Sequence, residues 1–196
     1  EEAIKTYDKV EEKIGLSEEL CLQKERIYEK LKNTNKAAAE LQKLIDANPK
    51  EPKYYTLLGN LYLDAGQKEK AIEAYEKVLQ VDPGNGEVHL ALADYYREIN
   101  QMQKSFDQLK FAFENPNLDA DTKSKILLKF SPFVETDEKV KALYDTLCGL
   151  LVQAHPDDAT AQYFYGDLLA GKKKYTEARD AFRKSAALDK NKFISW

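Results

Sequence analysis

The sequence predicts an all-α protein, a right-handed solenoid of antiparallel helical hairpins, and three recurring columns of residues support this prediction. Mostly small residues recur 34 positions apart, with one interval of 39: Ala3, Ala37, Ala71, Ser105, Tyr144 and Ala178. Four positions later, the same intervals give a bulky column: Tyr7, Leu41, Tyr75, Leu109, Cys148 and Phe182. A third column holds residues that stop helices: Pro49, Pro83, Asn117 and Pro156. No column alternates with a period of two, so no β-strand is expected.

Residues 52–85 show what one period encodes. Bulky residues lie three and four positions apart between Tyr55 and Tyr62, and the same spacing returns between Ala71 and Leu79. Both runs are typical of amphipathic helices of three to four turns, and the Gly66 between them is typical of a turn. Each period therefore encodes a helical hairpin, which buries its apolar face only by stacking on its neighbours.

The register divides the chain into a half repeat, five full repeats and the opening of another repeat. Residues 1–17 are predicted to form the second helix of a repeat whose first helix is missing, and residues 193–196 the start of a further repeat. The full repeats are 18–51, 52–85, 86–119, 120–158 and 159–192. This division predicts eleven helices. Because both ends interrupt a repeat, we expect the chain to be a piece of a longer protein.

The repeat at residues 120–158 is irregular, because it is longer than its neighbours. Ile126 and Phe130 fit a first helix, Pro132 interrupts it, and Thr136 is predicted to be the N-cap of the second helix. We expect the extra residues to lie in the hairpin turn. Such an insertion is either a tolerated loop or a contact surface, since functional residues concentrate on loops.

The repeat at residues 52–85 resembles the tetratricopeptide repeat (TPR) in eight residues: Tyr55, Leu58, Gly59, Tyr62, Ala71, Tyr75, Val78 and Pro83. The copy at 159–192 matches similarly, the copy at 86–119 more loosely, and together the copies cover nearly the whole chain. Residues 18–51 are weaker in the first helix, where Lys24 and Glu25 stand in place of the usual Leu and Gly. The resemblance implies stacked hairpins whose concave face is lined mainly by first helices.

Composition and motifs exclude several classes of function. A net charge of −4 at pH 7 argues against a general nucleic-acid-binding protein, which needs a surplus of lysine and arginine. The apolar stretches are far shorter than the roughly 20 residues of a membrane-spanning helix. The sequence shows no phosphate-binding loop, metal-binding motif or nucleophile–base pair. We therefore expect no enzyme activity, and no catalytic, metal or cofactor site.

The cysteines and histidines fit structural positions. Cys21 and Cys148 fall in core columns three repeats apart, which predicts two buried thiols and not a disulfide. His89 also falls in a packing column. His155 is expected at a helix end, where a cation suits the helix dipole.

The TPR resemblance implies that certain first-helix positions face a concave groove. Nine residues at these positions form the predicted partner-binding site: Leu22, Arg26, Asn60, Leu63, Leu90, Asp94, Arg97, Tyr163 and Asp167. The apolar members would anchor a bound segment by burial, and the polar members would set its orientation. The alternative is that these are ordinary exposed residues between stacked helices. The second helices carry at least as many charges, for example Glu73 and Lys77, and serve as the comparison surface.

The leading hypothesis for function is a non-enzymatic scaffold that binds a protein or peptide segment in its concave groove, as part of a longer bacterial protein. One alternative is the substrate-recruiting module of an enzyme whose catalytic domain is missing, and another is a glycan-binding protein of the cell envelope. The resemblance to bacterial multi-repeat proteins favours a periplasmic or outer-membrane location. Residues 86–119 carry three basic and six acidic side chains, and residues 159–196 carry eight and four. This charge difference would suit an acidic partner or end-to-end self-association.

Overall fold

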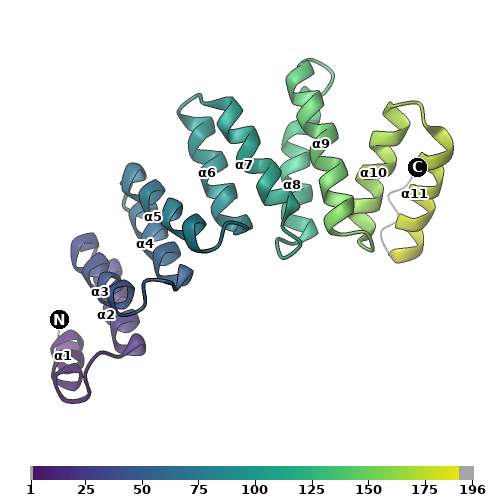
Figure 1. The fold of residues 1–196 in the computed structure, drawn as a ribbon. Helices are drawn as coiled ribbons and strands as arrows, with labels where there is room; N and C mark the ends of the chain where they lie inside the picture. Colours follow the sequence, from purple (N-terminus) through teal and green to yellow (C-terminus); the bar gives the residue numbers. More distant parts are fainter. Residues whose placement is uncertain (1, 190–196) are drawn as a thin grey trace. The chain divides into compact units, whose positions relative to one another are not determined.

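The computed structural model describes residues 2–189, and over these residues it contains α-helices, one short 3-10 helix and no strand (Figure 1). The α-helices are α1 (Glu2–Ile14), α2 (Glu18–Lys30), α3 (Thr34–Ala47), α4 (Pro52–Asp64), α5 (Lys68–Val81), α6 (Gly86–Glu98), α7 (Met102–Glu114), α8 (Ala120–Phe130), α9 (Glu138–Ala154), α10 (Ala159–Gly171) and α11 (Tyr175–Leu188). The 3-10 helix is η1 (Ser131–Phe133). The predicted all-α fold and its eleven helices are confirmed over this range, and the predicted repeat start at 193–196 lies outside it. The chain divides into two compact units, residues 1–88 (unit 1) and residues 89–196 (unit 2).

Unit 1 contains α1 and two hairpins, in which α2 packs against α3 and α4 packs against α5. The core includes Leu41, Leu61 and Val78, all of them buried. A Cβ atom at Gly59 would collide with the ring of Tyr75, so this glycine lets the α4 backbone approach that ring closely. The small and bulky columns of the sequence thus describe how the two helices of a hairpin fit together.

The turns of the four regular hairpins share one backbone geometry. Their second residues all have φ between 55° and 72°: Lys32, Gly66, Asn100 and Lys173. The next amide bonds back to a carbonyl five residues earlier, as when the Gln67 N–H donates to the Tyr62 carbonyl at 2.8 Å. This is the Schellman arrangement that ends many helices. Gly66 adopts the left-handed conformation without the steric cost that a side chain adds.

Lys24, a departure from the TPR pattern, is fully buried in unit 1. Its Nζ atom lies 2.6 Å from Glu11 Oε2, 3.1 Å from Asp8 Oδ1 and 3.2 Å from Glu40 Oε2. Burial opposes the charge, but the hydrogen bonds that the Lys24 ammonium donates to Glu11, Asp8 and Glu40 together hold the pKa of Lys24 above its ordinary value. The lysine therefore ties α2 to both α1 and α3, and this ionic contact replaces the apolar one that leucine makes in the family pattern.

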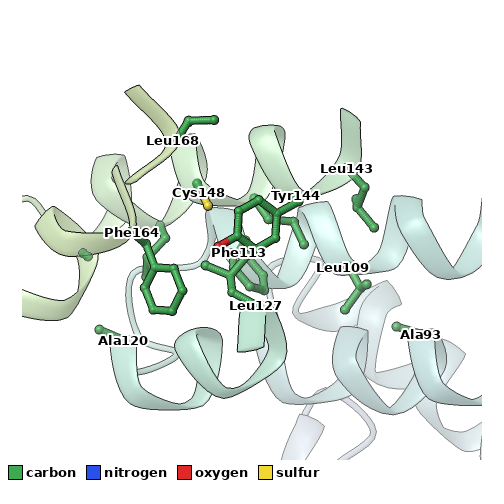
Figure 2. Close-up of a cluster of buried hydrophobic side chains, with 13 residues drawn as sticks. Ala93, Leu109, Phe113, Ala120, Leu127, Leu143, Tyr144, Cys148, Phe164 and Leu168 are labelled. Carbon is green, nitrogen blue, oxygen red and sulfur yellow. The ribbon is translucent and has the colours of Figure 1, made fainter. Parts of the chain in front are cut away.

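Unit 2 has a continuous apolar core that joins the residues of α6 in this unit to α7, α8, α9 and α10. Phe113, Leu127 and Cys148 are fully buried, and Tyr144 and Phe164 lie beside them (Figure 2). In α10, a Cβ atom at Gly166 would lie 2.7 Å from Cδ1 and Cε1 of the Phe182 ring. The α10–α11 hairpin therefore repeats the glycine–aromatic contact of Gly59 and Tyr75.

The irregular repeat differs from its predicted form in two ways. The N-cap of α9 is Asp137, whose Oδ1 accepts from the N–H groups of Lys139 and Val140 at 2.8 and 3.2 Å, so the prediction of Thr136 was wrong. The Thr136 hydroxyl instead donates to the Phe133 carbonyl. The added residues also lie only partly in the turn, since α9 has 17 residues where α5 has 14. The inserted residues of this repeat are therefore divided between a longer turn and a longer second helix.

A second fully buried lysine, Lys123 in α8, joins three segments of this repeat. Its Nζ atom donates to the Asn115 carbonyl at 2.6 Å and lies 3.0 Å from Nε2 of His155, the C-cap of α9. The same Nε2 lies 2.8 Å from the Leu118 carbonyl, which only accepts hydrogen bonds, so Nε2 either donates to this carbonyl or accepts from the Lys123 ammonium, but not both at once. Burial lowers the pKa of Lys123 to about 8, and Asp119 opposes this shift. His155 lies at a helix end, as predicted, and it also links α9 to the loop before α8.

Candidate protein-binding surfaces

Four of the nine predicted site residues lie in unit 1, on the first helices α2 and α4. Arg26 is exposed, and Leu63 keeps 43% of its surface exposed. Asn60 is exposed, but its Oδ1 accepts a hydrogen bond from the Tyr75 hydroxyl at 2.6 Å. Leu22 is half-buried and packs against the core. Arg26 and Leu63 are therefore the members of this set whose side chains are most available to a partner.

The other five predicted residues lie in unit 2, on α6 and α10. Asp94 and Arg97 are exposed and form an ion pair at 2.7 Å, one turn apart on α6. Leu90 is half-buried against the core. Tyr163 is also half-buried, with its ring centroid 5.9 Å from that of Phe164 and 5.7 Å from that of Phe182.

The last of the five, Asp167 on α10, is exposed. Asp94, Arg97 and Asp167 thus present charge to solvent in unit 2, whereas Leu90 and Tyr163 contribute to packing. The apolar anchors predicted for this unit are therefore less exposed than the sequence analysis expected.

A groove that the sequence analysis did not predict lies in unit 1. It has a volume of about 620 Å³, and it is lined by residues of α3, α4, α5 and the loop after α3: Gln42, Ile45, Pro49, Tyr55, Leu58, Tyr62, Lys70, Glu73, Ala74, Lys77, Gln80 and Val81. We call it the α3–α5 groove. Glu73 and Lys77, chosen from the sequence as a comparison surface, line this groove. None of the nine predicted residues does.

The α3–α5 groove uses a different face of α4 from the predicted site. At 100° per residue around a helix, Tyr55, Leu58 and Tyr62 fall within about 60° of one another. Asn60 and Leu63 lie about 80° or more from that stripe by the same arithmetic. The TPR signature positions Tyr55, Leu58 and Tyr62 would have located this surface, but the sequence analysis assigned them to packing alone.

The buried thiols are unsuited to nucleophilic chemistry. Cys21 and Cys148 are fully buried, as predicted. Burial raises the pKa of the Cys21 thiol to about 11 and that of the Cys148 thiol to about 12. A thiol is a nucleophile only when it is ionised, and both groups stay protonated at neutral pH.

Glu11, Cys21 and Glu40 bring three potential metal-ligand atoms within 4.8 Å of one another. The Lys24 ammonium already forms ion pairs with both glutamates of this group. Its hydrogen bond also holds the pKa of the Glu11 carboxyl below its ordinary value. The buried Lys24 ammonium therefore already neutralises the carboxylate charges that would attract a metal ion.

Over residues 2–189, each helix is too short or too polar to cross a lipid bilayer.

Stacked two-helix hairpins with a 34-residue period define a helical repeat protein. Sequence models described as tetratricopeptide repeat match residues 19–51, 52–85 and 150–192. The chain belongs to the tetratricopeptide repeat family. Members of this family are typically non-catalytic interaction modules, which makes the chain, in general terms, a protein-interaction scaffold.

Two curated proteins are similar to part of the chain. BBSome complex member BBS4 of Bos taurus is 30% identical over 107 residues, which cover 55% of this chain and 20% of the relative. The BBS4 homolog of Drosophila melanogaster is 28% identical over 134 residues, which cover 68% and 27%. The chain thus spans about a fifth to a quarter of the length of these relatives.

Solved structures with low sequence identity share the fold. The C-terminal part of a TPR repeat-containing protein from Cytophaga hutchinsonii aligns with a TM-score of 0.57, at 14% identity over 95% of this chain and 73% of that one. YrrB, described as a TPR protein with an unusual peptide-binding site, aligns with a TM-score of 0.53, at 17% identity over 95% and 93%. At these identities the likeness concerns the fold alone.

Proposed function

We propose that the chain is a non-enzymatic scaffold that binds a segment of a partner protein through the exposed side chains of its first helices. The observation that carries this proposal is the availability of Arg26 and Leu63 in unit 1 and of Asp94, Arg97 and Asp167 in unit 2. The helix packing leaves these side chains at the surface. Both curated relatives are named as members of the BBSome complex, which supports an assembly role.

The binding energy is expected to concentrate in a few of these residues. Interfaces obtain most of their affinity from side chains that bury area or make oriented charged hydrogen bonds. Leu63 has apolar surface left to bury, and the Arg97 guanidinium offers several donors in a fixed plane. Leu63 and Arg97 are therefore the residues of choice for a test, because both are exposed and their removal leaves the core intact.

A matched pair of variants tests this proposal. The 196-residue chain is used to isolate a partner, and the affinity of the purified partner is measured by calorimetry. Leu63→Ala combined with Arg97→Ala should weaken binding at least about tenfold, since each change removes an exposed first-helix side chain that can contact a partner. The control is Leu188→Ala combined with Arg179→Ala on the second helix α11.

The control has the same chemistry and nearly the same exposure. Leu188 is 41% exposed where Leu63 is 43% exposed, and the Arg179 side chain is 57% exposed where that of Arg97 is 56%. The control pair should change the affinity less than twofold. A partner that loses affinity only with the control pair would place the binding surface on second helices and contradict the proposal.

Location in a bacterial envelope remains a proposal that rests on the sequence resemblance. Fractionation of cells that express the full-length protein would test it, with the periplasmic and outer-membrane fractions expected to hold the protein. Recovery in the cytoplasmic fraction alone would contradict it.

A further inference from the structure

The α3–α5 groove combines an apolar floor with a polar rim. Ile45 and Ala74 are buried at its floor. Leu58 also lines the groove and is half-buried. The rings of Tyr55 and Tyr62 are half-buried and also line it. A floor of this kind gains free energy when an apolar side chain displaces water from it.

The rim of the groove carries more positive than negative charge. Lys70, Glu73 and Lys77 are the ionisable α5 residues that line it, and all three are exposed. Lys70 Nζ lies 5.3 Å above the centroid of the Tyr62 ring, and Lys77 Nζ donates to Gln80 Oε1 at 3.3 Å. Both lysines are thus held at the groove, where they favour a ligand that carries carboxylates.

The length of the groove indicates the form of the ligand. Its α5 wall runs from Lys70 to Val81, which at 1.5 Å per residue is about 16 Å. An extended chain advances about 3.3 Å per residue, so about five residues span the wall. The side-chain amides of Gln42 and Gln80 also line the groove, and amides can pair with the backbone of an extended segment.

We propose that the α3–α5 groove binds an extended segment of about five residues from a partner protein, in which apolar side chains contact the floor and carboxylates approach Lys70 and Lys77. Alternate side chains of an extended segment point to opposite sides. Apolar residues at every second position therefore enter the groove together, while the acidic residues between them stay near its rim. The proposal rests on the chain being a protein-binding scaffold, but it does not depend on the first-helix residues.

The test uses peptides of defined sequence and the whole 196-residue chain. Acetylated and amidated pentapeptides that alternate leucine or phenylalanine with glutamate are titrated into the protein by calorimetry. At least one should bind with a dissociation constant on the order of 100 μM, a modest affinity suited to a short segment. Peptides with lysine in place of glutamate, or serine in place of the apolar residues, should bind at least tenfold more weakly.

Variants of the protein then locate the bound peptide. Lys70→Glu combined with Lys77→Glu should weaken binding of the acidic peptide at least tenfold. Lys9→Glu combined with Lys30→Glu is the matched control, because it makes the same change in net charge with exposed lysines that do not line the groove. The control should change the affinity less than twofold.

Several outcomes would overturn the proposal. An equal loss in both lysine pairs would show that general charge attraction holds the peptide. Absence of binding at 1 mM peptide would remove the groove as a site for such segments, as would equal binding of the serine peptides. If the peptide tests fail in one of these ways while Leu63→Ala with Arg97→Ala still weakens binding of a partner protein, only the groove proposal fails and the first-helix function stands.

Discussion

At the scale of single residues, glycines in two neighbouring helices are predicted to respond oppositely to the same substitution. Gly166→Ala in α10 places a Cβ atom 2.7 Å from the Phe182 ring, so we expect a loss of about 1–3 kcal/mol in the free energy of unfolding through overpacking. At Gly149 in α9, a Cβ atom meets nothing within 4 Å. Gly149→Ala should raise the stability by up to about 1 kcal/mol, because alanine has the higher helix propensity.

Urea unfolding of both variants against the parent chain checks these two signs. A loss at Gly149 as large as that at Gly166 would mean that the contact with Phe182 is not the cause. The comparison is informative because both residues lie inside helices and both changes add a single methyl group.

Two residues show where sequence analysis reaches its limit at this scale. Lys24 could be identified as a departure from the TPR pattern, but its partners Asp8, Glu11 and Glu40 belong to two other helices. Their carboxylates meet the lysine only after the helices pack. The burial of Lys123 was unforeseen for the same reason, because its contacts come from a loop and from the end of α9.

At the scale of helices, the burial of Lys123 gives the irregular repeat a dependence on pH. The folded chain holds the pKa of Lys123 at about 8, against 10.5 for the ordinary group. Between these two values the unfolded chain binds more protons than the folded one, so this group makes stability rise with pH. The rise begins near pH 8 and, for a shift of this size, amounts to roughly 3 kcal/mol by pH 10.5.

The measurement is the free energy of unfolding at pH 7.5 and at pH 10, for the parent chain and for Lys123→Met. The raised pKa values of Tyr144 and of the buried thiols act in the opposite direction, and they are common to both proteins. From pH 7.5 to pH 10, the free energy of unfolding of the parent should therefore increase relative to that of the variant by about 1 kcal/mol or more, as linkage predicts. A difference that is the same at both pH values would contradict the buried, partly deprotonated lysine.

The regular helices could be predicted well because local signals specify them. Gly66 in the turn of residues 52–85, for example, has the left-handed geometry that its residue type favours. The start of α9 was harder, since Thr136 and Asp137 are both good N-caps and adjacent in the sequence. Only the backbone shows that Asp137 accepts the first N–H groups of the helix.

At the scale of the whole molecule, the class of protein was easier to predict than its binding surfaces. A period of 34 residues determines the hairpins, but the exposure of each side chain depends on what packs beside it. Leu63 stays exposed, whereas Leu90, at another of the predicted groove positions, is half-buried against the unit 2 core. The α3–α5 groove was missed because its lining comes from three helices, and Glu73 and Lys77 alone gave no sign of a hollow.

The central claim is that first helices bind the partner, and hydrogen–deuterium exchange of the 196-residue chain with and without a purified partner tests it most directly. Protection on binding should concentrate in α2, α4, α6 and α10, which carry Arg26, Leu63, Arg97 and Asp167. The second helices α7, α9 and α11 should exchange at the same rates in both states. Protection confined to α7, α9 and α11 would contradict the account.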